Sequence, residues 1–119
     1  MTENPINMKS IENRHYQLVN RLRSAEARFE RAPSSVCLVA VSKTQSPEAI
    51  RVIAALRQKD FGENQLQEAL GKVETLSDLD CTWHFIGSIQ TNKCRDIAAH
   101  FDWVHSVDRL KIAKRLSNL

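Results

Sequence analysis

The sequence predicts an α/β protein built on a parallel sheet, with one helix leading the chain. Residues 36–41 (VCLVAV) are apolar, rich in β-branched residues and too short for a helix, as in a strand buried on both faces. Strand and helix patterns then alternate four times at spacings of about 20–25 residues, which is typical of right-handed βαβ crossovers. Two architectures fit this alternation, a small doubly wound sheet and part of a (βα)8 barrel. Periodicity alone favours the doubly wound sheet.

The leading helix spans about residues 8–31. One face is an apolar stripe whose residues recur at three- and four-residue steps: Ile11, Leu18, Leu22, Ala25 and Phe29, with His15 on the same stripe. Arg and Glu fill the other face. Pro33-Ser34-Ser35 then breaks the helical pattern.

Capping residues and strand composition predict the later elements. Ser46-Pro47-Glu48 combines an N-cap, a first-turn proline and an acid at the positive helix end, so it begins a helix that runs to about Leu56. The remaining pattern predicts strands at 60–62, 82–86 and 102–107, and helices at 65–76, 92–100 and 109–119. A complete barrel needs about 250 residues, so four units in 119 residues would form half of one.

The bulk properties describe one globular domain over residues 1–119 and exclude several functional classes. Hydrophobic residues make up 42% and charged residues 26% of the chain, which are ordinary globular values. The net charge of +3 comes without a dense Lys/Arg run, so we expect no nucleic-acid partner, and no apolar run is long enough for a transmembrane helix. Cys37, Cys81 and Cys94 are widely separated and lack CxxC spacing. We therefore expect reduced thiols in a cytoplasmic protein and no metal site.

Polar residues follow the predicted strands at their carboxyl ends, where parallel α/β folds carry their chemistry. These residues are Ser42-Lys43-Thr44, Glu63-Asn64, Gly87-Ser88 and, after the fourth strand, Ser106 and Asp108. Lys43 follows directly on a buried strand. It is either a solvated or ion-paired lysine, which is the usual case, or a Schiff-base lysine, whose neutral amine partial burial would favour.

Three other polar positions leave alternatives open. His84 lies mid-strand between two aromatic residues, where a hydrogen-bonded core histidine is favoured over a catalytic base. Asn64 is either a turn residue that caps the next helix or a residue of the site. Glu63 and Asp108 would act as paired carboxylates only if the fold brings them together.

Four blocks of the sequence carry a family likeness. In chain order they are LVAVSKTQ (38–45), FGEN (61–64) with QEA (67–69), WHFIG (83–87) with QTNK (90–93), and VHSVDR (104–109). Together they closely resemble the pyridoxal phosphate homeostasis proteins, the YggS-type family, from about residue 8 to the last residue. The resemblance implies the N-terminal part of a (βα)8 TIM barrel like the N-terminal domain of alanine racemase, with about four βα units after a leading helix.

The same resemblance implies a cofactor site. Pyridoxal 5'-phosphate (PLP) would be bound as a Schiff base to Lys43, Asn64 matches a position that lines the cofactor pocket, and His84 and Gly87 belong to the strand on that side of the barrel. The implied function is a non-catalytic carrier or buffer of the cofactor in vitamin B6 and amino-acid homeostasis. Two alternatives are a racemase-like PLP enzyme, which needs an acid–base partner opposite Lys43, and a truncated product without cofactor binding.

The chain departs from the family in length and at one turn. Family members are about twice as long, as a full barrel requires, so we expect the segments that grip the cofactor phosphate to be missing and cofactor binding to be weaker. The open strand edges of a half barrel lead us to expect self-association. Arg57 stands where relatives often have a helix-ending Gly, and a left-handed conformation there would cost about 1 kcal/mol.

Overall fold

The computed structural model describes residues 7–119, and residues 1–6 of the predicted single domain lie outside the described part. The strands form one parallel sheet in the order β1-β2-β3-β4. They are β1 Ala40–Val41, β2 Asp60–Glu63, β3 Thr82–Phe85 and β4 Trp103–Val104. The helices of the described part are α1 Met8–Arg28, α2 Pro47–Ala54, α3 Leu66–Thr75, the 3₁₀ turn η1 Thr91–Lys93, α4 Cys94–His100 and α5 Leu110–Ser117.

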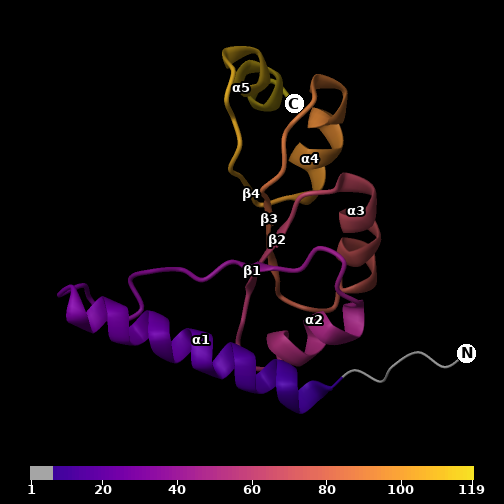
Figure 1. The fold of residues 1–119 in the computed structure, drawn as a ribbon. Helices are drawn as coiled ribbons and strands as arrows, with labels where there is room; N and C mark the ends of the chain where they lie inside the picture. Colours follow the sequence, from indigo (N-terminus) through magenta and orange to yellow (C-terminus); the bar gives the residue numbers. More distant parts are fainter. Residues whose placement is uncertain (1–6) are drawn as a thin grey trace, which may run out of the picture.

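The strand order decides between the two architectures that the sequence allowed. In a doubly wound sheet the strand order reverses and helices cover both faces, whereas here every strand pairs with its neighbours in the sequence. As a result α2, α3 and α4 lie on the same side of the sheet (Figure 1). This is the arrangement of a (βα)8 barrel. The barrel segment is confirmed, and the doubly wound sheet favoured by periodicity is wrong.

The hydrophobic core lies between the sheet and these helices. The register aligns Ala40 with Phe61 and Phe61 with Trp83, so side chains from three strands meet on the helix-covered face. The core is completed by buried residues of the helices and of the segments next to them: Ile50, Leu66, Ala69, Leu76, Ile89, Cys94, Ile97, Phe101 and Ile112.

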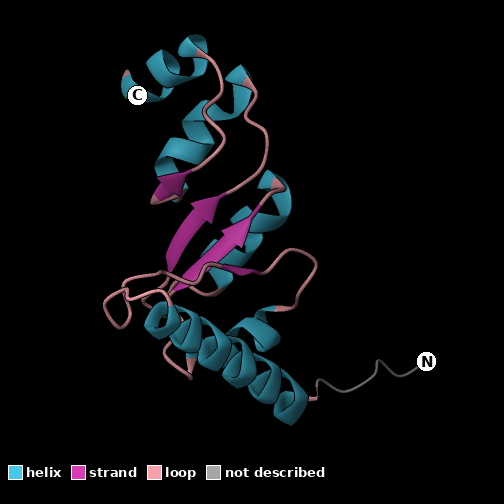
Figure 2. Ribbon diagram, turned by 60° about the vertical axis from the view of Figure 1, so that its left-hand side comes forward, coloured by secondary structure: helices cyan, strands magenta, loops and turns pink. Residues whose placement is uncertain are grey.

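The opposite face of the sheet, called the inner face below, is uncovered within the described residues (Figure 2). Val41 is 52% exposed and Trp103 is 60% exposed. The expectation that residues 36–41 form a strand buried on both faces is therefore wrong. Crossovers that all run in one direction place α2, α3 and α4 on a single face of the sheet and leave the other one bare.

β1 is also shorter than the strand predicted at 36–41. β2 begins only at Asp60, so the backbone before Val39 has no neighbouring strand and bonds to side chains instead. The N–H of Val36 donates to Glu26 Oε2 at 2.8 Å, and the carbonyl of Leu38 accepts from Gln58 Nε2 at 2.7 Å. β4 is likewise shorter than the strand predicted at 102–107, because its partner β3 ends at residue 85.

The helices lie where the sequence predicts them, with their ends shifted by a few residues. α2 ends at Ala54 instead of Leu56, and the helix predicted at 92–100 becomes η1 followed by α4. Gln65 and not Asn64 caps α3, because the Gln65 side-chain oxygen accepts the Glu68 N–H at 2.8 Å. Arg57, which follows α2, has a φ of 71°, so the left-handed residue considered there is present.

α1 ends at Arg28, before the predicted limit near residue 31, and its apolar stripe is only partly covered. The helix runs past the end of the sheet (Figure 1), and Leu18 and Phe29 remain 48% and 69% exposed. At the end of α1 the buried carboxylate of Glu26 accepts the Ser34 N–H at 3.0 Å and turns the chain back towards β1. No helix among residues 7–119 is both long and apolar enough to cross a membrane.

Candidate functional site

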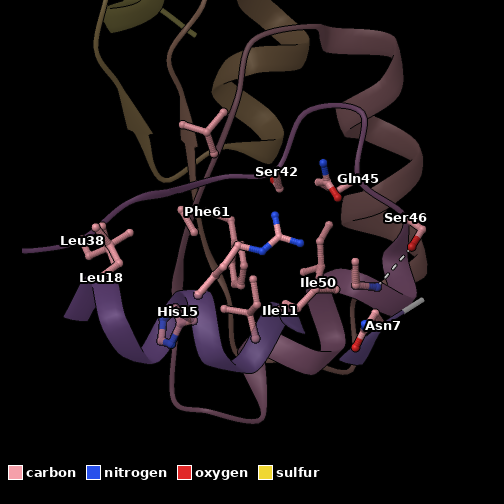
Figure 3. Close-up of a pocket in the computed structure, with 15 residues that line it drawn as sticks. Asn7, Ile11, His15, Leu18, Leu38, Ser42, Gln45, Ser46, Ile50 and Phe61 are labelled. Atoms are coloured by element: carbon pink, nitrogen blue, oxygen red, sulfur yellow. Dashed lines mark hydrogen bonds between the residues drawn. The ribbon is translucent and has the colours of Figure 1, made fainter. Parts of the chain in front are cut away.

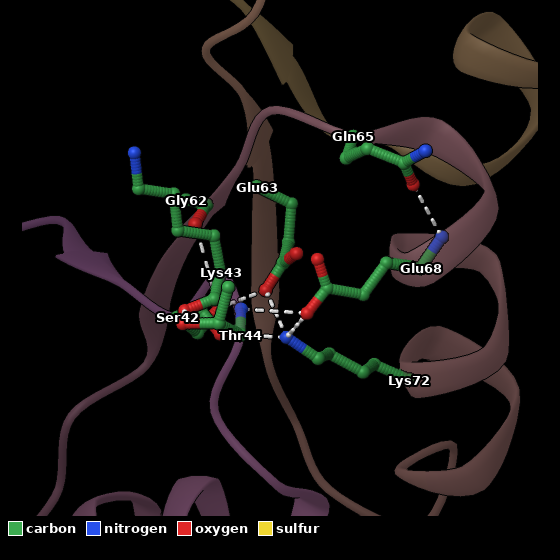
Figure 4. A network of polar contacts seen from close by, with 8 residues as sticks. All are labelled: Ser42, Lys43, Thr44, Gly62, Glu63, Gln65, Glu68 and Lys72. Atoms are coloured by element: carbon green, nitrogen blue, oxygen red, sulfur yellow. Dashed lines mark hydrogen bonds and ion pairs between the residues drawn. The ribbon is translucent and has the colours of Figure 1, made fainter.

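Lys43 lies at the carboxyl end of β1, on the inner face of the sheet. The Ser42 N–H donates to the Gly62 carbonyl at 3.0 Å and extends the pairing of β1 with β2 by one bond. Side chains alternate along a strand, so Lys43 follows Val41 on the inner face while Ser42 is buried on the helix-covered face. The Lys43 amine points away from α3 (Figure 4) and makes no hydrogen bond or ion pair with any described residue. It is therefore accessible to a small molecule at this rim.

Asn64 and Gly87 lie in contact just after the ends of β2 and β3. The Ile86 N–H donates to the Glu63 carbonyl at 2.9 Å, which draws the two strand ends together. A Cβ at Gly87 would lie 2.5 Å from the Asn64 carbonyl oxygen, so only glycine fits there. β1 pairs with β2 as far as Val41 and Gly62, so Lys43 and Asn64 each follow the end of one of these neighbouring strands. The structure thus brings Asn64 and Gly87 into contact and places Lys43 after the adjacent strand.

His84 lies deeper in the sheet, in the middle of β3, and its ring is bonded on both sides. Its Nε2 lies 2.8 Å from Asp60 Oδ1 and its Nδ1 lies 2.9 Å from His105 Nε2. The ring also stacks on Trp103, with centroids 6.1 Å apart and planes at 9°. This is the hydrogen-bonded core histidine that the sequence favoured. A contact between His84 and a cofactor stays a prediction.

Glu63 and Asp108 do not form a carboxylate pair. Glu63 is the last residue of β2, and its side chain faces α3 with 0% exposure, so it is not a rim residue as its place after the strand suggested. Asp108 is exposed and lies 3.5 Å from the guanidinium of its neighbour Arg109. The alternation of side chains along β2, which places Asn64 on the inner face, turns Glu63 to the other side.

The sequence interpretation missed a buried polar network behind Lys43. Lys72 Nζ, from α3, donates to the Ser42 carbonyl at 2.6 Å and contacts one carboxylate oxygen each of Glu63 and Glu68 at 2.9 Å (Figure 4). Ser42 Oγ donates to the same Glu63 oxygen. The signal in the sequence was a lysine on the apolar stripe of a helix, between the buried Ala69 and Leu76.

Acid is expected to weaken this network. The Lys72 ammonium first, and then the Thr44 N–H, hold the pKa of the Glu68 carboxyl below its usual 4.5. Because this pKa is lowered on folding, the stabilisation is complete above pH 4.5 and is lost as the pH falls through the lower folded-state value. The Glu26 pKa is lowered as well, mainly by the Val36 N–H.

The stability of the protein is therefore expected to decrease in acid. At pH values below 4.5 the urea concentration at the unfolding midpoint, measured by circular dichroism, should decrease, and it should decrease less steeply in Glu68→Gln. A midpoint concentration that increases in acid contradicts this prediction.

A separate cleft lies between α1, β1 and α2 (Figure 3). It has a volume of about 500 Å³, and Ile11, Leu18 and Ile50 supply part of its apolar wall. None of Lys43, Asn64, His84 and Gly87 lines it. We therefore place the candidate site at the inner rim, where a free amine is available, and not in this cleft.

Among residues 7–119 no group of three or more His, Cys, Asp and Glu side chains is arranged to hold a metal ion. His100 Nδ1 lies 2.9 Å from the Asp96 carbonyl, and His105 bonds to His84.

Two curated proteins with one shared name match almost the whole chain. The pyridoxal phosphate homeostasis protein of Pseudomonas aeruginosa is 54% identical over 110 residues, which cover 92% of this chain and 48% of that protein. The protein of the same name from Escherichia coli K12 is 41% identical over 114 residues, which cover 93% of this chain and 49% of the relative. The chain is homologous to half of a pyridoxal phosphate homeostasis protein. No protein-family model matches the sequence.

Two solved structures resemble this chain in fold. PipY, the COG0325 family member of Synechococcus elongatus PCC7942, was solved with PLP bound; it is 46% identical, with a TM-score of 0.72 over 84% of this chain and 46% of PipY. A protein from Bifidobacterium adolescentis has a TM-score of 0.84 at 24% identity over 98% of this chain and 52% of that protein, which supports the fold alone. The chain thus spans about half the length of the pyridoxal phosphate homeostasis proteins and of PipY.

Proposed function

We propose that the chain binds PLP through a Schiff base at Lys43. The observation that carries the proposal is the Lys43 amine, which points away from α3 and bonds to no described residue; Asn64 and Gly87 follow the next two strands. PipY, whose structure contains PLP, and the pyridoxal phosphate homeostasis proteins support the choice of cofactor. His84 completes the proposed site at a deeper level of the same face.

The residues at the rim suit this chemistry. The cofactor supplies an aldehyde, and the neutral Lys43 Nζ would form a C=N bond with the aldehyde carbon while the carbonyl oxygen leaves as water. An amine without a carboxylate partner gives up no ion pair when it becomes neutral. The 119 residues span about half the length of the relatives, so we expect these 119 residues by themselves to bind PLP more weakly than a full-length pyridoxal phosphate homeostasis protein.

The direct test is to mix the chain with PLP, record the visible absorption band, reduce with borohydride and map the modified residue. We expect the adduct at Lys43. It should be lost in Lys43→Ala and retained in Lys111→Ala, a matched change of an exposed lysine on α5. Modification of many surface lysines, or the same extent of modification in Lys43→Ala as in the wild type, would contradict the proposal.

We further propose that binding serves to carry or buffer the cofactor in vitamin B6 and amino-acid homeostasis and not to turn over a substrate. The relatives are named for homeostasis and not for a reaction. On the inner face the acid–base candidates Asp60, His84 and His105 bond to one another. A racemase-like enzyme would interconvert alanine enantiomers, and circular dichroism would detect this reaction. A truncated product without cofactor binding would show no visible absorption band when mixed with PLP.

We also propose a cytoplasmic location. The free thiols of Cys37, Cys81 and Cys94 support this proposal, because disulfides are rare in the cytoplasm.

The 119-residue chain by itself is proposed to self-associate. β1 and β4 each pair along one side only within the described residues, and apolar side chains on the inner face, including Val41, are exposed. We expect sedimentation at micromolar concentration to show species heavier than the 13.6 kDa monomer. Val41→Lys on the edge strand should shift the distribution towards monomer, and Leu110→Lys on the exposed side of α5 should not. A compact wild-type monomer contradicts this expectation.

A further inference from the structure

The turn that carries Lys43 has an unfavourable backbone conformation. Thr44, the residue after Lys43, has a φ of 62°. A β-branched residue rarely adopts this left-handed conformation, and such residues persist only where their surroundings hold them. The hydrogen bond from Thr44 Oγ1 to the Lys43 carbonyl, at 2.6 Å, is local and does not tie the turn to the rest of the fold.

The surroundings hold this turn on both sides of Lys43. Before it, the Ser42 carbonyl accepts from Lys72 Nζ at 2.6 Å, and the Ser42 hydroxyl donates to Glu63. After it, the Thr44 N–H donates to Glu68 Oε2 at 2.6 Å. Lys72 joins the two sides, because its ammonium contacts both carboxylates at 2.9 Å. We call Glu63, Glu68 and Lys72 the Lys72 clamp.

The clamp is built from groups that are costly to bury. Lys72 and Glu63 have side-chain exposures of 7% and 0%, and Glu68 is one-third exposed at 32%. One oxygen of Glu63, Oε1, has no hydrogen-bond partner among the described residues. Buried charges of this kind add little net stability compared with apolar packing. Their presence is therefore better explained by a role in fixing a local conformation than by a contribution to stability.

We infer that Glu63, Glu68 and Lys72 are positioning residues that hold the Ser42–Thr44 turn so that the Lys43 amine faces the inner rim. The inference rests on the proposed function of Lys43. All three clamp residues contact Ser42 or Thr44, and none contacts the Lys43 side chain, which points the other way (Figure 4). A fixed backbone leaves only side-chain rotamers to be ordered when the amine reacts, and this lowers the entropic part of the barrier.

The test compares Glu68→Ala and Glu68→Gln with Asp78→Ala in the whole chain. Asp78 is the matched control, because it accepts two hydrogen bonds from Arg51 at 2.8 Å and contacts no clamp residue. Three quantities are measured: the rate of Lys43 modification by PLP after borohydride trapping, the amide hydrogen exchange of Thr44, and thermal unfolding. If Glu68→Ala does not fold, Glu68→Asp replaces it, since the shorter side chain cannot reach both Thr44 and Lys72.

We expect Glu68→Ala to slow Lys43 modification and to speed Thr44 exchange, each by about tenfold, the factor of one charge-assisted hydrogen bond. Glu68→Gln should keep Thr44 protected, because the amide oxygen accepts the same N–H, and should recover part of the modification rate. Asp78→Ala should lower thermal stability without changing either rate. A purely structural role would give Glu68→Ala and Asp78→Ala the same rates, and that result overturns the inference.

Failure of the proposed function would look different. In that case wild-type Lys43 is not modified at all, and the clamp is judged on hydrogen exchange alone. Slow exchange of Thr44 that becomes fast in Glu68→Ala supports the clamp, whereas fast exchange in the wild type overturns it.

Discussion

Gly87→Ala is expected to destabilise the protein by about 3 kcal/mol or more, at the upper end of the usual cost of overpacking. The added Cβ would lie 2.5 Å from the Asn64 carbonyl oxygen and 3.0 Å from the Asn64 Cα. Both are backbone atoms and cannot rotate away. The ends of β2 and β3 would have to separate, which breaks the bond from Ile86 to Glu63 and moves Asn64 relative to Lys43.

The other two glycines provide matched controls for this prediction. At Gly71, in α3, an added Cβ meets nothing within 4 Å, so Gly71→Ala should stabilise the helix by about 0.5–1 kcal/mol. At Gly62 the Cβ would meet Val39 Cγ1 at 3.1 Å and Ile86 Cδ1 at 3.2 Å, and these side chains can yield. Urea unfolding of the three variants should therefore rank Gly71→Ala above Gly62→Ala and Gly87→Ala last. Equal stability of Gly71→Ala and Gly87→Ala would contradict the close approach at the rim.

Lys72→Met is expected to cost about 3–5 kcal/mol of folding stability, the range for removing one partner of a buried ion pair. Methionine has a similar length but leaves the Glu63 carboxylate, which is 0% exposed, without its cation. The Ser42 hydroxyl would be the remaining partner of Glu63 in the described structure, and the Ser42 carbonyl would lose its donor. A loss of this size is a large part of the total stability of a small domain.

Two comparisons separate charge burial from general damage. Lys59→Met breaks an exposed pair, with Lys59 Nζ 3.1 Å from Asp80, and should cost about 0–1 kcal/mol. The double variant Lys72→Met/Glu63→Leu removes both buried charges and should recover most of the stability lost in Lys72→Met. Denaturant unfolding measures all four proteins. A Lys72→Met variant as stable as Lys59→Met would contradict the buried pair.

Local patterns predicted most of the helices and the positions of the strands. Ser46 before Pro47 predicted the start of α2, and the Ser46 hydroxyl accepts the Ala49 N–H at 3.2 Å in the structure. The same reasoning failed where a partner from another element decides the outcome. Residues 36–38 have strand composition but lie outside the sheet, because β2 begins at Asp60 and offers them no residue to pair with. A cap by Asn64 was one of two alternatives for that residue, and the structure places the cap one residue later, at Gln65.

The sequence likewise predicted only part of the candidate site. The sequence predicted that Lys43, Asn64 and Gly87 follow the ends of three successive strands, and the structure places them there. Their role as a cofactor site stays a prediction. The partners of His84 did not, because Asp60 and His105 belong to the neighbouring strand segments on either side of β3. Lys72 was overlooked because most lysines on helices are solvated.

The sequence by itself determined the alternation of strands and helices and placed Lys43 directly after the first strand, because hydrophobic periodicity and capping act over a few neighbouring residues. Only the tertiary structure decided that α2, α3 and α4 share one face of the sheet, and that Lys72 reaches back to Ser42 across 30 residues of sequence. Contacts of this kind depend on how the strands stack and which way their side chains alternate. The bare inner face and the fixed turn around Lys43 are consequences of that packing.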